Sequence, residues 1–181
     1  MSDPRSLDDG AEAIAVAQQV ASGTDSIAVA SDLVDEATPA ERVPEEALWK
    51  RIRMMTVAEK VKLALKGNKD ARAVLLRDSN RVIPRLVLQN PRISEDEILM
   101  LSKDRNTDEE LLRMIAESRE WTKIYAVRAA LVENARTPVV TALKLLVTLA
   151  EREILRLAKS KNVPSIIATQ ARRISAQAQR R

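Results

Sequence analysis

The nine residues ILMLSKDRN, at positions 98–106, return as ILRLAKSKN at positions 154–162. The first, second, fourth, sixth and ninth positions of the two copies are identical. Similar spacings recur elsewhere, because Asn80 precedes Asn106 by 26 positions and Asn90 precedes Asn134 by 44. A period in the twenties, with apolar residues before each Asn, is typical of short helical units stacked side by side. Such units cannot bury their apolar faces alone, so the pattern predicts that the stack itself is the fold.

The composition favours helices over sheets. Hydrophobic residues make up 45% of the 181 residues and aromatic residues only 2%, with no Phe. A core of Leu, Ile, Val and Ala suits helix packing, and three Gly leave few tight turns for β-hairpins. The chain has no Cys and no His, which excludes disulfides, thiol chemistry and the commonest metal ligand. We therefore expect an all-α fold and no metal or other cofactor.

Helix boundaries are marked along the chain. Three hydroxyl residues stand three positions before a glutamate, the spacing of a capping box, and Pro44, Pro138 and Pro164 suit a first helical turn. The capping pairs are Thr56 with Glu59, Ser94 with Glu97 and Thr107 with Glu110. Most apolar runs end at Asn or at Gly67-Asn68, residues that favour a left-handed C-terminal conformation. We expect helices near residues 45–54, 57–66, 70–77, 82–89, 95–103, 108–118, 121–133, 138–147, 150–159 and 164–178.

Charge divides the chain into two parts. Residues 1–48 carry two basic and eleven acidic residues, a net charge of −9, and residues 49–181 carry 28 basic and 15 acidic residues, a net charge of +13. We expect residues 1–44 to form an acidic, mostly disordered leader, because they lack bulky core residues and their two possible helices are short. Residues 45–181 would form the helical-repeat domain. The alternative for the leader is a docking segment whose acidic residues lie on the basic body or on another protein.

Two strings, VLQNPRISEDEIL and VRAALVENARTPVVTALKLL, resemble leucine-rich variant repeats, a bacterial α-solenoid family related in shape to HEAT and armadillo repeats. The family unit reads roughly VRxAVAxNPxTPxxLLxxLA, and Asn90-Pro91 keeps its Asn-Pro pair. Further matching positions are Val127, Arg128, Ala130, Asn134, Thr137, Pro138, Leu143 and Leu146. The resemblance covers about residues 60–170, although Ala135 replaces the Pro after Asn134. It implies a right-handed α-solenoid that acts as a binding scaffold, and without Cys the iron–sulfur site linked with one member of the family is not carried over.

Basic residues supply candidate binding positions. Arg81 and Arg85 form an i, i+4 pair, and Lys123 with Arg128 would repeat it further along, so that stacked helices would place both pairs in a ladder. The ladder is either an ordinary solvated face or a surface for an acidic ligand. Arg172 and Arg173 lie near the end of the chain, where a fraying basic terminus is the simplest interpretation and partner binding the alternative.

Aromatic residues supply one more candidate. Trp121, Tyr125 and Arg128 have the i, i+4, i+7 spacing of one helix face and could form a platform for a nucleobase or a proline-rich peptide. Trp121 also falls in the core stripe with Ile124 and Val127, so packing is the better explanation for Trp121, while both remain open for Tyr125.

We expect a non-catalytic protein-interaction scaffold whose partner is another protein with an acidic or helical segment. The alternative is a nucleic-acid-binding repeat protein whose basic surface is gated by the acidic leader. An enzyme on a HEAT-like scaffold, as in some DNA glycosylases, is a third possibility that would need a carboxylate and aromatic cleft. No small-molecule substrate is evident. The apolar runs are shorter than the ~20 residues of a membrane span, and with no signal peptide we expect a cytoplasmic protein.

Overall fold

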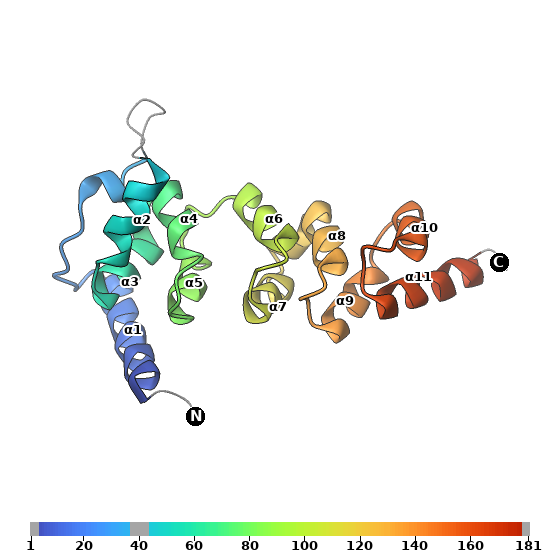
Figure 1. The fold of residues 1–181 in the computed structure, drawn as a ribbon, viewed down its shortest axis with the longest axis horizontal. Helices are drawn as coiled ribbons and strands as arrows, with labels where there is room; N and C mark the ends of the chain where they lie inside the picture. Colours follow the sequence, from blue (N-terminus) through green and yellow to red (C-terminus); the bar gives the residue numbers. More distant parts are fainter. Residues whose placement is uncertain (1–3, 37–43, 179–181) are drawn as a thin grey trace. The chain divides into compact units, whose positions relative to one another are not determined.

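The computed structural model describes residues 4–36 and 44–178, and every regular element in these ranges is helical, which confirms the predicted all-α class (Figure 1). The chain forms two compact units, Met1–Ile93 and Ser94–Arg181. No helix of the described ranges combines the length and the apolar character that crossing a bilayer takes.

Unit 1 is built around α3. Helices α1 and α5 both pack on α3, and α2 packs on α4. The elements are α1 (Pro4–Ser22), the 3₁₀ helix η1 (Ser31–Leu33), α2 (Glu45–Arg53), α3 (Val57–Lys66), α4 (Lys69–Leu75) and α5 (Val82–Val87). Most of their buried apolar side chains form one cluster made of Ala, Val, Leu and Ile, as the composition predicts.

Unit 2 contains two alternating series of helices, one made of α6, α8 and α10 and the other of α7, α9 and α11. Helix α6 contacts α8, and α8 packs on α9. Helix α9 in turn contacts α11, and α10 pairs with α11. The elements are α6 (Glu95–Lys103), α7 (Glu109–Glu117), the 3₁₀ helix η2 (Trp121–Lys123), α8 (Tyr125–Glu133), α9 (Val139–Leu146), α10 (Glu151–Lys159) and α11 (Ser165–Ala178).

The helix starts in unit 2 follow one spacing. Helices α6, α8 and α10 begin at positions 95, 125 and 151, and α7, α9 and α11 begin at 109, 139 and 165, so both series advance by 30 and then by 26 residues. The two copies of the stretch at positions 98–106 and 154–162 therefore run through the ends of α6 and α10, which start and stop 56 positions apart. We call residues related by these offsets matched positions.

The leader differs from the prediction of disorder. Its described part holds α1 and η1, and Ala13, Val20 and Leu33 are buried, with Leu33 only 2% exposed. A helix of this kind is weak alone, but α3 and α5 supply an apolar surface against which its Ala and Val side chains pack. Leader residues 4–36 thus belong to unit 1, and the boundary between compact units lies after Ile93. Residues 37–43 of the predicted leader lie outside the described ranges.

Two local predictions are wrong. The helix expected at 121–133 is interrupted at Ile124, whose backbone is extended, so η2 ends there and α8 starts afresh at Tyr125. The asparagines at the helix ends are not left-handed either, because no described residue other than Gly has a positive φ. Asn134, for example, has φ −74° and ψ 121°.

The capping boxes are confirmed at two of the three predicted places. Thr56 with Glu59 and Ser94 with Glu97 make the reciprocal hydrogen bonds. At the third place Asp108 caps α7 instead, while the Thr107 hydroxyl donates to the Leu101 carbonyl at 2.8 Å.

Candidate interaction surfaces

Buried asparagines join the end of one helix to the end of another. Asn134 Nδ2 donates to the carbonyls of Ser102 and Asp104, both at 2.9 Å, and its Oδ1 accepts from the Arg136 amide at 2.9 Å. Asn90 repeats this arrangement with the carbonyls of Ala64 and Gly67. Because each amide satisfies two helix-end carbonyls that lack partners inside their own helix, these side chains hold neighbouring helices in register.

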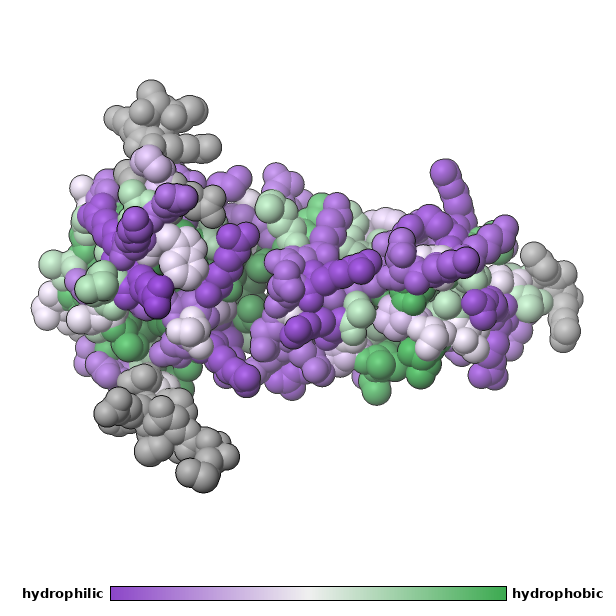
Figure 2. Space-filling view, viewed as in Figure 1, coloured by the Kyte–Doolittle hydropathy of each residue, from purple (hydrophilic) through white to green (hydrophobic). Residues whose placement is uncertain are grey.

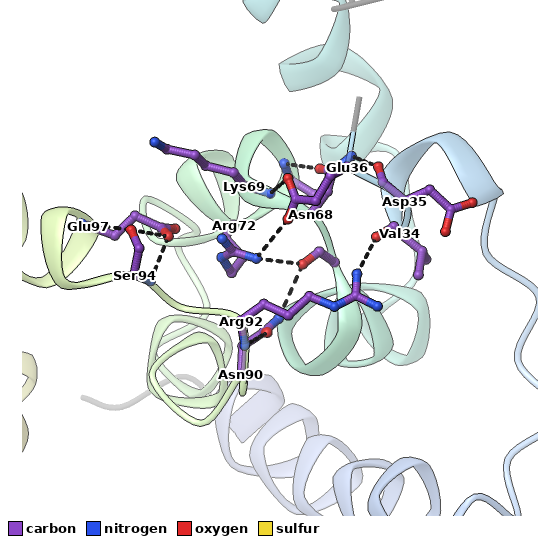
Figure 3. A network of polar contacts seen from close by, with 12 residues as sticks. Val34, Asp35, Glu36, Asn68, Lys69, Arg72, Asn90, Arg92, Ser94 and Glu97 are labelled. Atoms are coloured by element: carbon purple, nitrogen blue, oxygen red, sulfur yellow. Dashed lines mark hydrogen bonds and ion pairs between the residues drawn. The ribbon is translucent and has the colours of Figure 1, made fainter. Parts of the chain in front are cut away.

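Asn68 does the same for the leader. Its Nδ2 donates to the carbonyls of Asp32 and Asp35, each at 2.8 Å, and its backbone amide donates to the Leu33 carbonyl at 2.9 Å (Figure 3). The end of η1 therefore occupies, beside Asn68, the place that a helix end occupies beside Asn90 and Asn134. We call Asn68, Asn90 and Asn134 the helix-end asparagines.

Acidic residues of the leader lie on cations of unit 1. Asp25 pairs with Lys62 at 2.6 Å, and Asp32 pairs with Arg51 at 2.6 Å. The hydrogen bond from Lys62 lowers the pKa of Asp25, against the opposing effect of burial, and the bond from Arg51 likewise lowers the pKa of Asp32. The structure thus agrees with the docking alternative for this part of the leader.

The end of the docked segment is fixed by two more arginines. Arg92 Nη1 donates to the Val34 carbonyl at 2.7 Å, and the buried Arg72 lies 3.7 Å from the Glu36 carboxylate while donating to the Gly67 carbonyl at 3.0 Å (Figure 3). Because Arg72 is buried, this cation contributes to the internal packing of unit 1 and is not available at the surface.

The predicted basic residues fall in both units. Arg81 is exposed at the start of α5 and Arg85 is half-buried on it, both in unit 1, whereas Lys123 and Arg128 belong to unit 2. A ladder through all four therefore stays a prediction. Within unit 2 the structure does bring two of them together, because Arg128 Nη1 donates to the carbonyls of Thr122 at 2.6 Å and Lys123 at 3.3 Å.

The aromatic platform forms only in part. The Arg128 guanidinium lies 5.4 Å from the centre of the Tyr125 ring, a cation–π distance, and the Tyr125 side chain is exposed. Its hydroxyl accepts from the Ala150 amide at 3.2 Å, at the start of α10. Trp121 is half-buried on η2 and does not share a helix with the other two residues. Tyr125 and Arg128 therefore have structural contacts that explain them.

Arg172 and Arg173 lie on α11, a continuous helix, and both are exposed. Arg172 Nε donates to the Ala158 carbonyl at 2.9 Å, which joins α11 to the end of α10 much as the helix-end asparagines join other helices.

One surface was missed by the sequence analysis. Val140 and Val147 on and just after α9 are 66% and 64% exposed, and Ile166 on α11 is 48% exposed. Apolar side chains are visible at the surface in the part of Figure 2 where Figure 1 shows α9. We call these three residues, with the exposed Lys144 and Arg173, the α9–α11 face.

Comparison of the chain with protein-family models, with curated proteins and with solved structures finds no match. Among the residues that the structure describes, no three acidic side chains are grouped as metal ligands would be.

Proposed function

We propose that this protein is a non-catalytic interaction scaffold, a right-handed α-solenoid whose exposed helix faces hold another protein. The observation that carries the proposal is the equal advance of two helix series, by 30 and 26 residues, in unit 2. Helices that advance in step expose corresponding positions side by side, which creates an extended surface for a partner.

The helix-end asparagines support the same proposal. Asn90 and Asn134 are the positions where the sequence resembles the Asn of the leucine-rich variant unit, and both make the buried contacts that keep adjacent helices in register. We therefore propose that the chain is a divergent repeat protein of that kind. Its partner would be a protein with an acidic or helical segment, encountered in the cytoplasm.

A pull-down with the tagged full-length chain tests this function. The scaffold proposal expects a protein to be retained in stoichiometric amount from native lysate, both with and without nuclease. Loss of all retained material after nuclease treatment would contradict the proposal and favour the nucleic-acid alternative.

That alternative rests on one observation, the net charge of +13 on residues 49–181. The gating part of it has a specific difficulty, because the described leader acids Asp25 and Asp32 pair with Lys62 and Arg51 and not with the four ladder residues. A leader that covers Arg81 or Arg85 would need contacts other than these two.

A further inference from the structure

The chain contains its own control for the α9–α11 face. Thirty residues before Val140 and Val147, the matched positions on α7 are Glu110 and Glu117. Glu117 is exposed, and Glu110 is half-buried and pairs with Arg113, so the same two positions carry charged side chains on α7. On α9 the corresponding side chains are valines that remain about two thirds exposed.

Folding alone does not explain these valines. A β-branched side chain loses χ1 freedom in a helix and is a poorer helix former than Glu, and an exposed one gains little from burial to offset that loss. Val140 and Val147 are seven positions apart, so they lie on one side of α9, about 10 Å apart along the axis at 1.5 Å per residue. The side of α9 that faces away from the core is therefore more apolar than the matched side of α7.

Helix α11 extends this apolar stripe. It contacts α9, and its residue matched to Val140 is Ile166, which is also exposed. The residue matched to Val147 is Arg173, and Lys144 lies between the two valines in sequence. Three apolar side chains from two adjacent helices are thus accompanied by two exposed cations.

The charge of this face has one sign. Neither α9 nor α11 contains an Asp or a Glu. Within the described ranges neither Lys144 nor Arg173 is engaged by a carboxylate. Apolar residues flanked by cations, without acidic residues, are complementary to an amphipathic helix that carries acidic side chains beside an apolar stripe.

We propose that the α9–α11 face binds an acidic amphipathic helix of another protein. The inference rests on the proposed scaffold function and names its partner class. The partner's Leu, Ile or Val side chains would cover Val140, Val147 and Ile166, and its carboxylates would reach Lys144 and Arg173. A nucleic acid fits less well because the middle of the face is apolar, and a lipid surface fits less well because the face has no aromatic side chain to sit at the headgroup level.

The test uses the full chain and two labelled synthetic peptides, an amphipathic Leu/Glu helix and the same helix with Lys in place of Glu, in fluorescence anisotropy. We expect saturable binding of the Leu/Glu peptide and at least tenfold weaker binding of the Leu/Lys peptide. Val140→Glu with Val147→Glu, which installs the residues found at the matched positions of α7, should weaken Leu/Glu binding at least tenfold. The thermal midpoint of this variant, which we call the double-valine variant, should stay close to that of the unchanged chain because both valines are exposed.

Two further variants sharpen the test. Met54→Glu changes an exposed apolar residue of unit 1 and should leave peptide binding unchanged. Lys144→Glu with Arg173→Glu should reverse the preference, so that the Leu/Lys peptide binds more tightly than the Leu/Glu peptide. Equal Leu/Glu binding by the unchanged chain and the double-valine variant would overturn the proposal.

Other occupants of the face give distinguishable results. Concentration-dependent dimers in sedimentation velocity that the double-valine variant abolishes would assign the face to a second copy. Binding of phosphatidylserine vesicles without binding of the Leu/Glu peptide would assign it to lipid. If the unchanged chain binds neither peptide, while the double-valine variant still retains a protein from nuclease-treated lysate, the scaffold function stands and the proposed role of the α9–α11 face is wrong.

Discussion

At the scale of single residues, the helix-end asparagines do what no other side chain does equally well. In Asn134 the amide group donates both of its hydrogens to carbonyls of a neighbouring helix end, while its oxygen accepts from the backbone two residues on. Aspartate would keep the acceptor and lose both donors. At these three positions Asn thus supplies donors between helices and not a left-handed backbone.

Asn134→Asp should therefore destabilise the chain by about 1–3 kcal/mol, because the Ser102 and Asp104 carbonyls lose the Asn134 hydrogen bonds and a carboxylate is placed against them. The exposed Asn106, a member of the same sequence pattern, is the matched control, and Asn106→Asp should change the free energy of unfolding by less than about 0.5 kcal/mol. Urea denaturation of both variants measures the difference. Equal effects would show that burial of the amide does not matter.

The ion pair of Asp25 with Lys62 makes the docked leader sensitive to acid. Its hydrogen bond from Lys62 lowers the pKa of the carboxyl in the folded state, so the unfolded state binds more protons when the pH nears the ordinary value of about 3.9. The stabilisation is complete above that value and is lost as the pH falls through the lowered folded pKa. The thermal midpoint should drop over this window, and Asp25→Asn should lower the midpoint at pH 7 and flatten the acid part of the profile.

At the scale of elements, local signals predicted most helices, and contacts made only in the folded chain decided the exceptions. The capping boxes at Thr56 and Ser94 predicted two helix starts correctly because both partners lie within one turn. The interruption at Ile124 has no such local signal, since the apolar spacing runs on through it. There the Arg128 guanidinium binds the carbonyls of Thr122 and Lys123, which a continuous helix would use for its own hydrogen bonds.

The leader was mispredicted for a related reason. Its alanines and valines form a weak stripe, and only the packing surface on α3 and α5 makes α1 a stable helix. That surface cannot be seen from the leader's own composition. Its acidic residues, by contrast, did indicate docking as an alternative, and Asp25 and Asp32 lie on cations of unit 1.

If η1 is docked as the structure has it, Leu33→Ala should cost about 2–5 kcal/mol of unfolding free energy, because Leu33 is buried in the core of unit 1. Ile14→Ala, also in the leader but at an exposed site, should cost less than about 0.5 kcal/mol. Chemical denaturation of the two variants provides the measurement. A leader that contributes nothing to unit 1 would make the two costs equal and small.

At the scale of the whole molecule, composition and periodicity were enough to predict the helical class but not the exposed surfaces. Helix α9 and the residue that follows it have apolar side chains on several sides, among them Val140, Leu146 and Val147. Periodicity therefore does not show that Leu146 points inward while the two valines stay exposed. Only the position of α11 and α8 around α9 separates them. The basic residues were easier to find in the sequence. Their roles come from the structure, in which Arg128 and Arg172 make structural contacts and Arg173 is exposed.

The charge of the whole chain leads to the last prediction. Residues 49–181 carry +13, so some attraction to polyanions is unavoidable at low salt, and steep loss of it on adding salt is expected for nonspecific contacts. For a protein-binding scaffold we expect the full chain to bind labelled generic RNA and DNA weakly, with no measurable binding at about 0.15 M salt, where the Debye length is about 8 Å.

The four ladder residues provide the decisive variant. Changing Arg81, Arg85, Lys123 and Arg128 to Glu should reduce the residual low-salt binding in proportion to the charge removed, as any eight-unit change of net charge would. A change of the same size at four exposed cations outside the ladder, Lys50, Lys103, Lys144 and Lys159, should have the same effect. Tight binding at physiological salt that only the ladder variant abolishes would contradict this expectation, because it requires a localised phosphate-binding surface, and the nucleic-acid alternative would then replace the scaffold.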